Sequence, residues 1–85
     1  MSSQTIIISN LPTECDEAWL RGEAKHPERI QSVDMLKADD PETFGVTLVV
    51  TFDGDRAIAD SLVQRFHGKS VGGRTIRVYA PIFGG

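Results

Sequence analysis

Several residue types that common protein classes depend on are scarce in this chain of 85 residues. A single cysteine, Cys15, excludes an intramolecular disulfide and favours a reducing compartment. No apolar run approaches the ~20 residues that a membrane-spanning helix needs. Residues 1–4 contain neither the basic segment nor the apolar run of a signal peptide. We therefore expect an intracellular protein, and these observations leave nucleus and cytoplasm open.

Positive charge is not in excess either. The chain has 9 Lys and Arg residues against 12 Asp and Glu residues, which gives a formal net charge of −3. Modules that bind nucleic acid usually carry a basic patch, so this balance argues against a large phosphate-binding surface. Net charge does not fix the distribution of charge, however, and the cations that are present can still cluster on one face.

Patterns typical of metal sites and of catalysis are also missing. His26, His67 and Cys15 lie far apart in the sequence and lack the spacing of metal ligands. No nucleophile stands with a base and an orienting group in a recognisable pattern. The sequence therefore predicts no metal, no other cofactor and no enzymatic activity.

What the sequence does contain is a succession of short strand and helix patterns. Runs of β-branched and alternating apolar residues predict strands at residues 5–9, 30–36, 45–52 and 74–80. The first helix follows Asp16, a suitable N-cap, and Cys15 and Leu20 have the spacing of a hydrophobic staple. The second helix follows residues 53–55, Asp-Gly-Asp, which offer an N-cap, and it ends at Gly68. It presents one apolar stripe, formed by Ala59, Leu62, Val63 and Phe66.

This order, βαββαβ, predicts an α+β fold of the ferredoxin-like, split-βαβ type, with a four-stranded antiparallel sheet and both helices on one face. Residues 37–43 and Gly72-Gly73 are predicted turns. We expect one domain over residues 5–80, a disordered N-terminus at residues 1–4 and a flexible tail at residues 81–85. The second face of the sheet is left open, so function is expected there or in the loops.

Alternation along the strands predicts which side chains lie on that open face. The surface is aliphatic and hydroxyl-bearing, with Arg77 and Tyr79 at one side. Its predicted members are Thr5, Ile7 and Ser9 on the first strand, Ser32, Asp34 and Leu36 on the second, Thr47, Val49 and Thr51 on the third, and Thr75, Arg77 and Tyr79 on the fourth.

Three segments together resemble the RNA-recognition motif over residues 5–80. Residues 6–11, Ile-Ile-Ile-Ser-Asn-Leu, follow the shorter signature of that family, with Ile7 in place of its aromatic ring. Residues 45–52 align with the longer signature, where Thr47 and Val49 replace two further rings and Val50, Thr51 and Phe52 fit. Residues 67–78 resemble the Gly-then-Gly-Arg turn that leads into the family's last strand.

The resemblance implies a nucleic-acid-binding module that binds single-stranded RNA through the open sheet face and its loops. Because a stack of a base on an aromatic ring contributes about 1–3 kcal/mol, the missing rings imply that this binding is weak. The positions that match the family's binding surface, and hence the predicted contact residues, are Ile7, Asn10, Thr47, Val49, Arg77 and Tyr79.

The alternative hypothesis is a protein–protein interaction module on the same scaffold, with little or no RNA binding. An Ile, Val and Thr surface packs well against protein, so the partner would use the open sheet face or the first helix. One subclass of the family binds a tryptophan-bearing peptide through acids on the first helix and an Arg-x-Phe turn. Here Glu17 and Glu23 are available, but the turn reads Arg74-Thr75-Ile76. Self-association through the open face is a second version.

Five further residues keep two interpretations each. Trp19 is either a partner anchor or a side chain at the rim of the core. Lys37, Lys69 and Arg74 either meet phosphates beside the sheet or are solvated charges. Phe83 either lies back across the open face or belongs to the tail.

Overall fold

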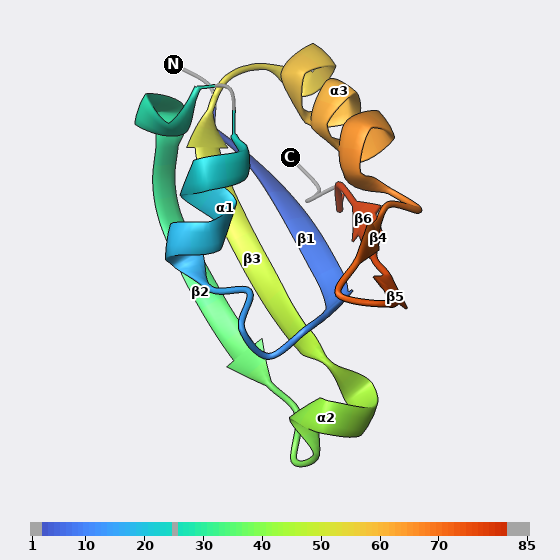
Figure 1. The fold of residues 1–85 in the computed structure, drawn as a ribbon. Helices are drawn as coiled ribbons and strands as arrows, with labels where there is room; N and C mark the ends of the chain where they lie inside the picture. The colour runs from blue at the N-terminus through green and yellow to red at the C-terminus, as the bar shows by residue number, and fades with distance from the viewer. Residues whose placement is uncertain (1–2, 25, 82–85) are drawn as a thin grey trace.

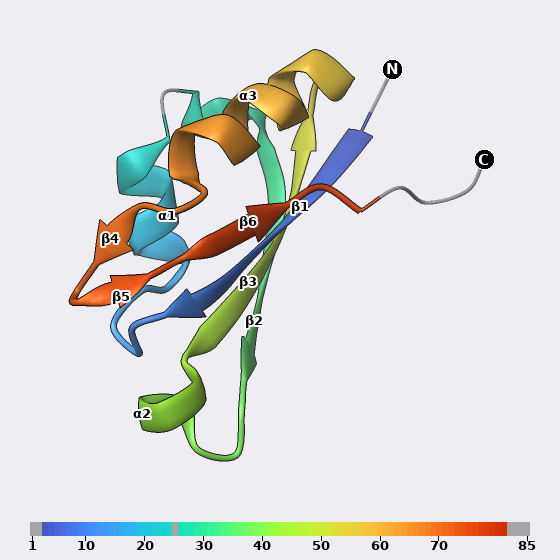
Figure 2. The same cartoon turned by 90° about the vertical axis from the view of Figure 1, so that its right-hand side faces the viewer.

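The computed structural model describes residues 3–24 and 26–81. Its centre is a four-stranded antiparallel sheet in the order β2-β3-β1-β6 (Figure 1). Figure 2 views the sheet nearly edge-on and shows α1 and α3 on one side, with no described helix over the other. The bounds are β1 Ser3–Leu11, α1 Glu17–Glu23, β2 Ile30–Lys37, β3 Val46–Asp53, α3 Arg56–Phe66 and β6 Arg77–Tyr79. The predicted α+β, βαββαβ arrangement is confirmed.

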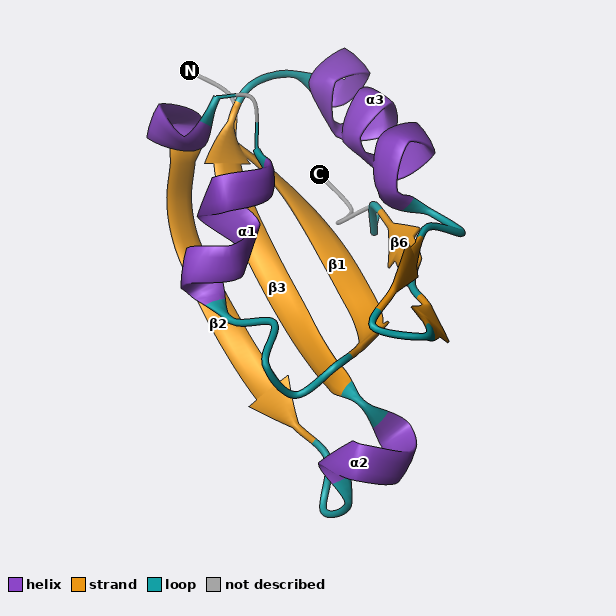
Figure 3. Cartoon of the chain, in the orientation of Figure 1, coloured by secondary structure: helices purple, strands orange, loops and turns teal. Residues whose placement is uncertain are grey.

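Two short helical elements were not predicted (Figure 3). A 3₁₀ turn, η1 (Pro27–Arg29), precedes β2, and a one-turn helix, α2 (Pro41–Phe44), replaces part of the predicted turn at residues 37–43. The reason for α2 is local: the Asp40 carboxylate accepts hydrogen bonds from the Thr43 hydroxyl at 2.7 Å and from the Thr43 backbone N–H at 3.4 Å. Asp40 therefore acts as an N-cap, directly before a proline, which is favoured in a first helical turn.

The predicted last strand, residues 74–80, is divided in the structure. β4 (Ser70–Val71) and β5 (Arg74–Thr75) form a small hairpin, and β6 follows after Ile76. The hairpin closes at Gly72 and Gly73, whose φ angles of 56° and 80° suit a tight two-residue turn. The backbone N–H of Ile76 donates to the Lys69 carbonyl at 2.9 Å and not to β1. This interrupts the predicted strand between β5 and β6.

β1 starts two residues earlier than predicted. Ser3 lies opposite Asp53 and Gln4 lies opposite Phe52. The disordered N-terminus expected at residues 1–4 therefore does not extend to Ser3 and Gln4, because β3 is long enough to supply both with ladder partners. Residues 1–2, and residues 82–85 of the expected tail, including Phe83, lie outside the described residues.

Two β-bulges adjust the register of the sheet. One falls between Ile30 and Ser32 of β2, which lie opposite consecutive residues of β3. The extra residue, Gln31, explains how Ile30 and Val33 both pack against the core although they are an odd number of positions apart. The other bulge lies between Ile8 and Leu11 of β1.

The core fills the space between the sheet and the helices. It consists of Ile6, Ile8, Leu11, Cys15, Leu20, Val46, Leu48, Val50, Phe52, Ala59, Phe66, Ile76 and Val78. All predicted inward positions of β1 and β3 are in this set, so the predicted alternation is confirmed for both central strands. Trp19 is half-buried against the same cluster, which agrees with the interpretation of this residue as a side chain at the rim of the core.

The predicted helix caps are present. The Asp16 carboxylate accepts the Trp19 backbone N–H at 3.1 Å, and the Asp55 carboxylate accepts the Ile58 N–H at 3.1 Å. Cys15 is buried beside α1, and burial raises the pKa of its thiol above the ordinary value of 9.0, with smaller contributions from neighbouring carboxylates. None of the helices in the described part of the chain has the length and hydrophobicity to cross a membrane.

Candidate nucleic-acid interface

A single row of side chains crosses the open face of the sheet. Strand register places Asp34 of β2 opposite Val49 of β3, Val49 opposite Ile7 of β1, and Ile7 opposite Tyr79 of β6. Ile7 and Val49 are half-buried, whereas the side chain of Tyr79 is 51% exposed on the edge strand. We call these four residues the central row. The structure thus brings together three of the predicted contact residues, Ile7, Val49 and Tyr79.

Hydroxyl and aliphatic side chains border the central row. On one side, the hydroxyls of Thr5 and Thr51 lie 3.5 Å apart at hydrogen-bond distance. On the other side, Thr47 lies opposite Leu36, whose side chain is 55% exposed. Tyr79 is the only aromatic residue that the described strands place on this face, because Phe52 points into the core.

The open face carries charge of both signs. Arg77 is exposed on β6 opposite Ser9, whose hydroxyl donates to the Arg77 carbonyl at 3.5 Å. Asp34 is exposed at the other end of the central row. Within the described residues neither side chain forms an ion pair, so a ligand on this face would meet one free guanidinium and one free carboxylate.

Asn10 lies at the bulge of β1 and is occupied by contacts within the protein. Its backbone has a φ of 64°, in the left-handed region that asparagine tolerates better than most residues. Its side-chain amide donates to the Thr75 carbonyl at 2.8 Å, and its side-chain oxygen accepts from Arg74 Nη2 at 2.7 Å. What the structure shows for Asn10 is a positioning role, and direct contact with a nucleic acid stays a prediction.

Arg74 joins three segments at this corner of the sheet. Its Nε donates to the Asn10 carbonyl at 3.2 Å, and its Nη2 also donates to the Thr43 carbonyl at 3.0 Å. Gly45 packs into the same corner with a φ of 78°, and a Cβ built there would lie 2.9 Å from the Leu11 carbonyl oxygen. The corner therefore fixes α2 and the end of β1 relative to each other, and the Arg74 guanidinium is engaged within the fold.

Two other cations considered as phosphate contacts differ in their surroundings. Lys37 is exposed at the end of β2. Lys69 is directed to the helix side, where its Nζ lies 3.6 Å from the Glu23 carboxylate and 5.6 Å from the centre of the Phe66 ring.

Within the described chain no three His, Cys, Asp or Glu side chains form a group that could hold a metal ion.

Sequence reasoning passed over one exposed aromatic side chain near the sheet. Phe44, the last residue of α2, is 68% exposed. The sequence indicates this exposure, because Phe44 stands between the predicted turn at residues 37–43 and Gly45, outside the alternating part of any strand. Its place at the α2 corner makes it a candidate to contact a ligand that extends beyond the sheet.

The domain has a four-stranded antiparallel sheet with two helices on one face, and its other face is open to a ligand. Residues 6–77 match the model of the family described as the RNA recognition motif. The chain therefore belongs to the RNA recognition motif family.

Solved structures show the same fold at low sequence identity. The chain resembles the crystal structure of RNA binding protein PG1, with a TM-score of 0.72 and 16% identity over 96% of this chain and 98% of that one. It also resembles Plasmodium falciparum SR1-RRM1 in complex with ACAUCA RNA, with a TM-score of 0.67 and 22% identity over 95% and 86% of the two chains. The Rna15 RRM with bound RNA (GU) gives a TM-score of 0.69 and 14% identity over 92% and 82%. A sequence comparison with curated proteins found no match.

Proposed function

We propose that this chain is a nucleic-acid-binding module that binds single-stranded RNA weakly through its open sheet face. The central row, in which Ile7 and Val49 lead to the exposed ring of Tyr79, is the observation that carries the proposal. Family membership and the RNA bound in two similar structures support the choice of ligand. The proposal includes no catalytic step.

Each predicted contact residue has a role that follows from its chemistry. The Tyr79 ring stacks on a base, and the Arg77 guanidinium pairs with a phosphate or a base edge. Ile7, Val49 and Thr47 offer apolar and hydroxyl contacts to a neighbouring nucleotide. Asn10 acts through the corner that it forms with Arg74, by holding the end of β1 beside the hairpin.

Weak affinity follows from the same surface. Three positions that carry rings in the family signatures are Ile7, Thr47 and Val49 here, and each lost stack removes about 1–3 kcal/mol. The carboxylate of Asp34 in the central row repels phosphate, and the net charge of −3 gives no long-range attraction to offset this.

The test compares two arginine substitutions that change charge equally. Arg77→Gln removes the cation of the open face, and Arg56→Gln removes a cation of α3, where Arg56 pairs with Asp60 at 3.4 Å on the helix side. We expect Arg77→Gln to weaken binding of a fluorescent mixed-sequence single-stranded RNA. The slope of the logarithm of the binding constant against the logarithm of salt concentration should become shallower by about 0.7, the value for one phosphate contact. Arg56→Gln should leave both unchanged. Equal effects of the two substitutions on fluorescence anisotropy would contradict the proposal.

A second function, protein interaction through the open face, is favoured by one observation. Leu36 is 55% exposed beside Thr47, so the aliphatic centre of the face extends to the edge strand β2. If the partner is a second copy of the chain, sedimentation at millimolar concentration will show dimers, and Leu36→Lys will abolish them. A purely monomeric profile rules out self-association and leaves RNA or a different protein as the ligand of this face.

A further inference from the structure

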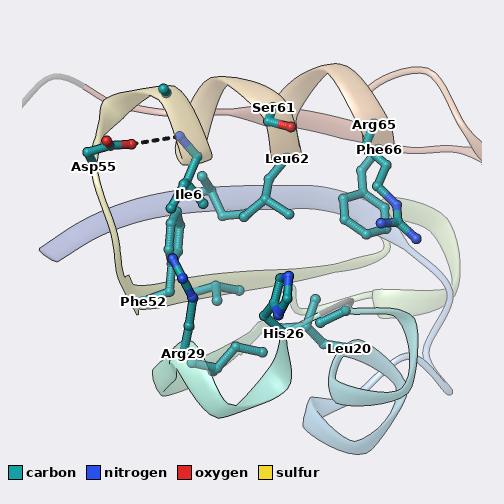
Figure 4. A pocket seen from close by; sticks show the side chains of 15 residues that line it. Ile6, Leu20, His26, Arg29, Phe52, Asp55, Ser61, Leu62, Arg65 and Phe66 are labelled. Carbon is teal, nitrogen blue, oxygen red and sulfur yellow. Dashed lines mark hydrogen bonds between the residues drawn. The ribbon is translucent and has the colours of Figure 1, made fainter.

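A hollow lies between the two main helices, on the side of the sheet opposite the central row (Figure 4). It exists because α1 packs over β2 whereas α3 packs over β1 and β6, which leaves a gap above the middle of the sheet. Its volume is about 630 Å³. Ligand sites in proteins usually measure about 300–1,000 Å³, so the hollow is large enough to accept side chains of a partner. We call it the interhelical groove.

The interhelical groove is apolar inside. Its floor is formed by Phe52 and its neighbours on the sheet, which are buried. Its walls are half-buried aliphatic side chains, Ala24 after α1 and Ile58 and Leu62 on α3. Ser61, exposed on α3, lies at the mouth. An apolar side chain that enters would therefore contact the walls and exclude water from them.

The mouth of the groove is cationic. Arg29 of η1 and Arg65 of α3 reach it from opposite walls (Figure 4). Among the described residues neither guanidinium forms an ion pair, and the Arg65 guanidinium only lies 5.5 Å from the centre of the Phe66 ring. Two other arginines on the helices, which do not line the groove, are paired instead: Arg21 with Glu17 at 2.9 Å and Arg56 with Asp60 at 3.4 Å.

One carboxylate lines the groove, and it already has a partner. Asp55 caps α3, and its oxygen accepts the Ile58 backbone N–H (Figure 4). His26, also at the mouth, lies 3.3 Å from the Glu28 carboxylate. The groove thus combines an apolar interior with two guanidiniums that form no ion pair within the described residues, although Arg29 interacts electrostatically with the exposed carboxylate of Glu28 beside it.

We propose that the interhelical groove binds a segment of a partner protein in which one large apolar side chain is flanked by carboxylates. The apolar side chain enters between α1 and α3, and the carboxylates pair with Arg29 and Arg65. An RNA strand fits less well, since it brings one phosphate per nucleotide to a mouth with two guanidiniums and offers no aliphatic anchor. Because the groove and the central row lie on opposite faces of the sheet, the peptide and RNA can bind together.

The probes are short synthetic peptides with a central tryptophan or leucine flanked by glutamates, and matched peptides with lysines in place of the glutamates. Binding to the full chain is followed by amide chemical shifts. Arg29→Gln and Arg65→Gln test the cations, with Arg56→Gln as the control of equal charge change. Ser61→Trp fills the mouth from an exposed position on α3, and Gln64→Trp places the same ring on an exposed position of α3 that does not line the groove.

We expect an acidic peptide to shift amides of α1 and α3, including Ala24 and Leu62, and the lysine peptides to shift none. Arg29→Gln and Arg65→Gln should each weaken binding up to about fivefold, and Ser61→Trp should abolish it, while both controls bind like the unchanged chain. The proposal is overturned if neither acidic peptide shifts the groove at millimolar concentration, if the lysine peptides bind equally, or if Ser61→Trp binds unchanged. Shifts of the same amides on addition of RNA alone would also overturn it.

Discussion

Replacing Val49 with phenylalanine tests why RNA binding through the open face is weak. Val49 lies in the middle of the central row, between Ile7 and Asp34, at a position where the family's longer signature carries a ring. Two strand spacings separate it from Tyr79, which is about 10 Å, so the two rings would lie far enough apart to hold different bases. Val49→Phe therefore restores one stacking position without competing with Tyr79.

The expected gain follows from the energy of one stack. A base on an aromatic ring contributes about 1–3 kcal/mol, which corresponds to about 5- to 150-fold in affinity. The fold should tolerate the change, because Val49 faces away from the core and phenylalanine suits a strand as well as valine, so the free energy of unfolding should change by about 0.5 kcal/mol or less. Thermal unfolding checks this before affinities are compared.

The assay is fluorescence anisotropy of a labelled mixed-sequence single-stranded RNA at low ionic strength. Gln64→Phe is the matched control, since it adds the same ring to an exposed position on α3, behind the sheet. Val49→Phe should bind RNA at least about fivefold more tightly than the unchanged chain, and Gln64→Phe should not. If Val49→Phe folds normally and binds no more tightly, the missing rings do not explain the weak affinity.

Three other predictions concern the charge of the open face, the packed corner and the buried thiol. Asp34→Asn should raise RNA affinity about two- to fivefold at low salt, and the gain should shrink at higher salt in the same titration. Gly45→Ala should lower the free energy of unfolding by about 2 kcal/mol and the melting temperature by about 10 °C, because its Cβ meets the Leu11 carbonyl at a left-handed φ. Gly73→Ala, with a similar φ but open space, should cost about half as much. Because burial raises the pKa of Cys15 above 9.0, stability to denaturant should fall as pH rises from about 9 towards the folded pKa, and Cys15→Ala should lack this decline.

The open face could be predicted from the sequence because strand alternation has a strict period of two. On β3 the apolar residues Val46, Leu48, Val50 and Phe52 alternate with a second set that contains two threonines, so only one register buries an entirely apolar set. Both helix caps could be predicted for a different reason, since aspartate directly before a helical pattern is a start signal. The pattern that gave the resemblance to the RNA recognition motif thus also placed the central row.

The corner and the interhelical groove could not be predicted, because both depend on where separate elements meet. Arg74 and Asn10 lie far apart in the sequence, and nothing local indicates that a guanidinium will bridge the bulge of β1 to Thr43. α2 was missed for a different reason, since four residues are too short to show periodicity although Asp40 before a proline is a start signal. The groove depends on the displacement of a seven-residue α1 towards β2, which only packing determines.

Amide chemical-shift mapping during titration with single-stranded RNA tests most directly whether the open sheet face is the binding surface. The largest shifts should fall on Ile7, Val49 and Tyr79 and on their strand neighbours, with Ala24 and Leu62 on the helix side unchanged. An RNA titration that moves only helix-side amides, or none at high micromolar RNA and low salt, would contradict the assignment of function to the central row.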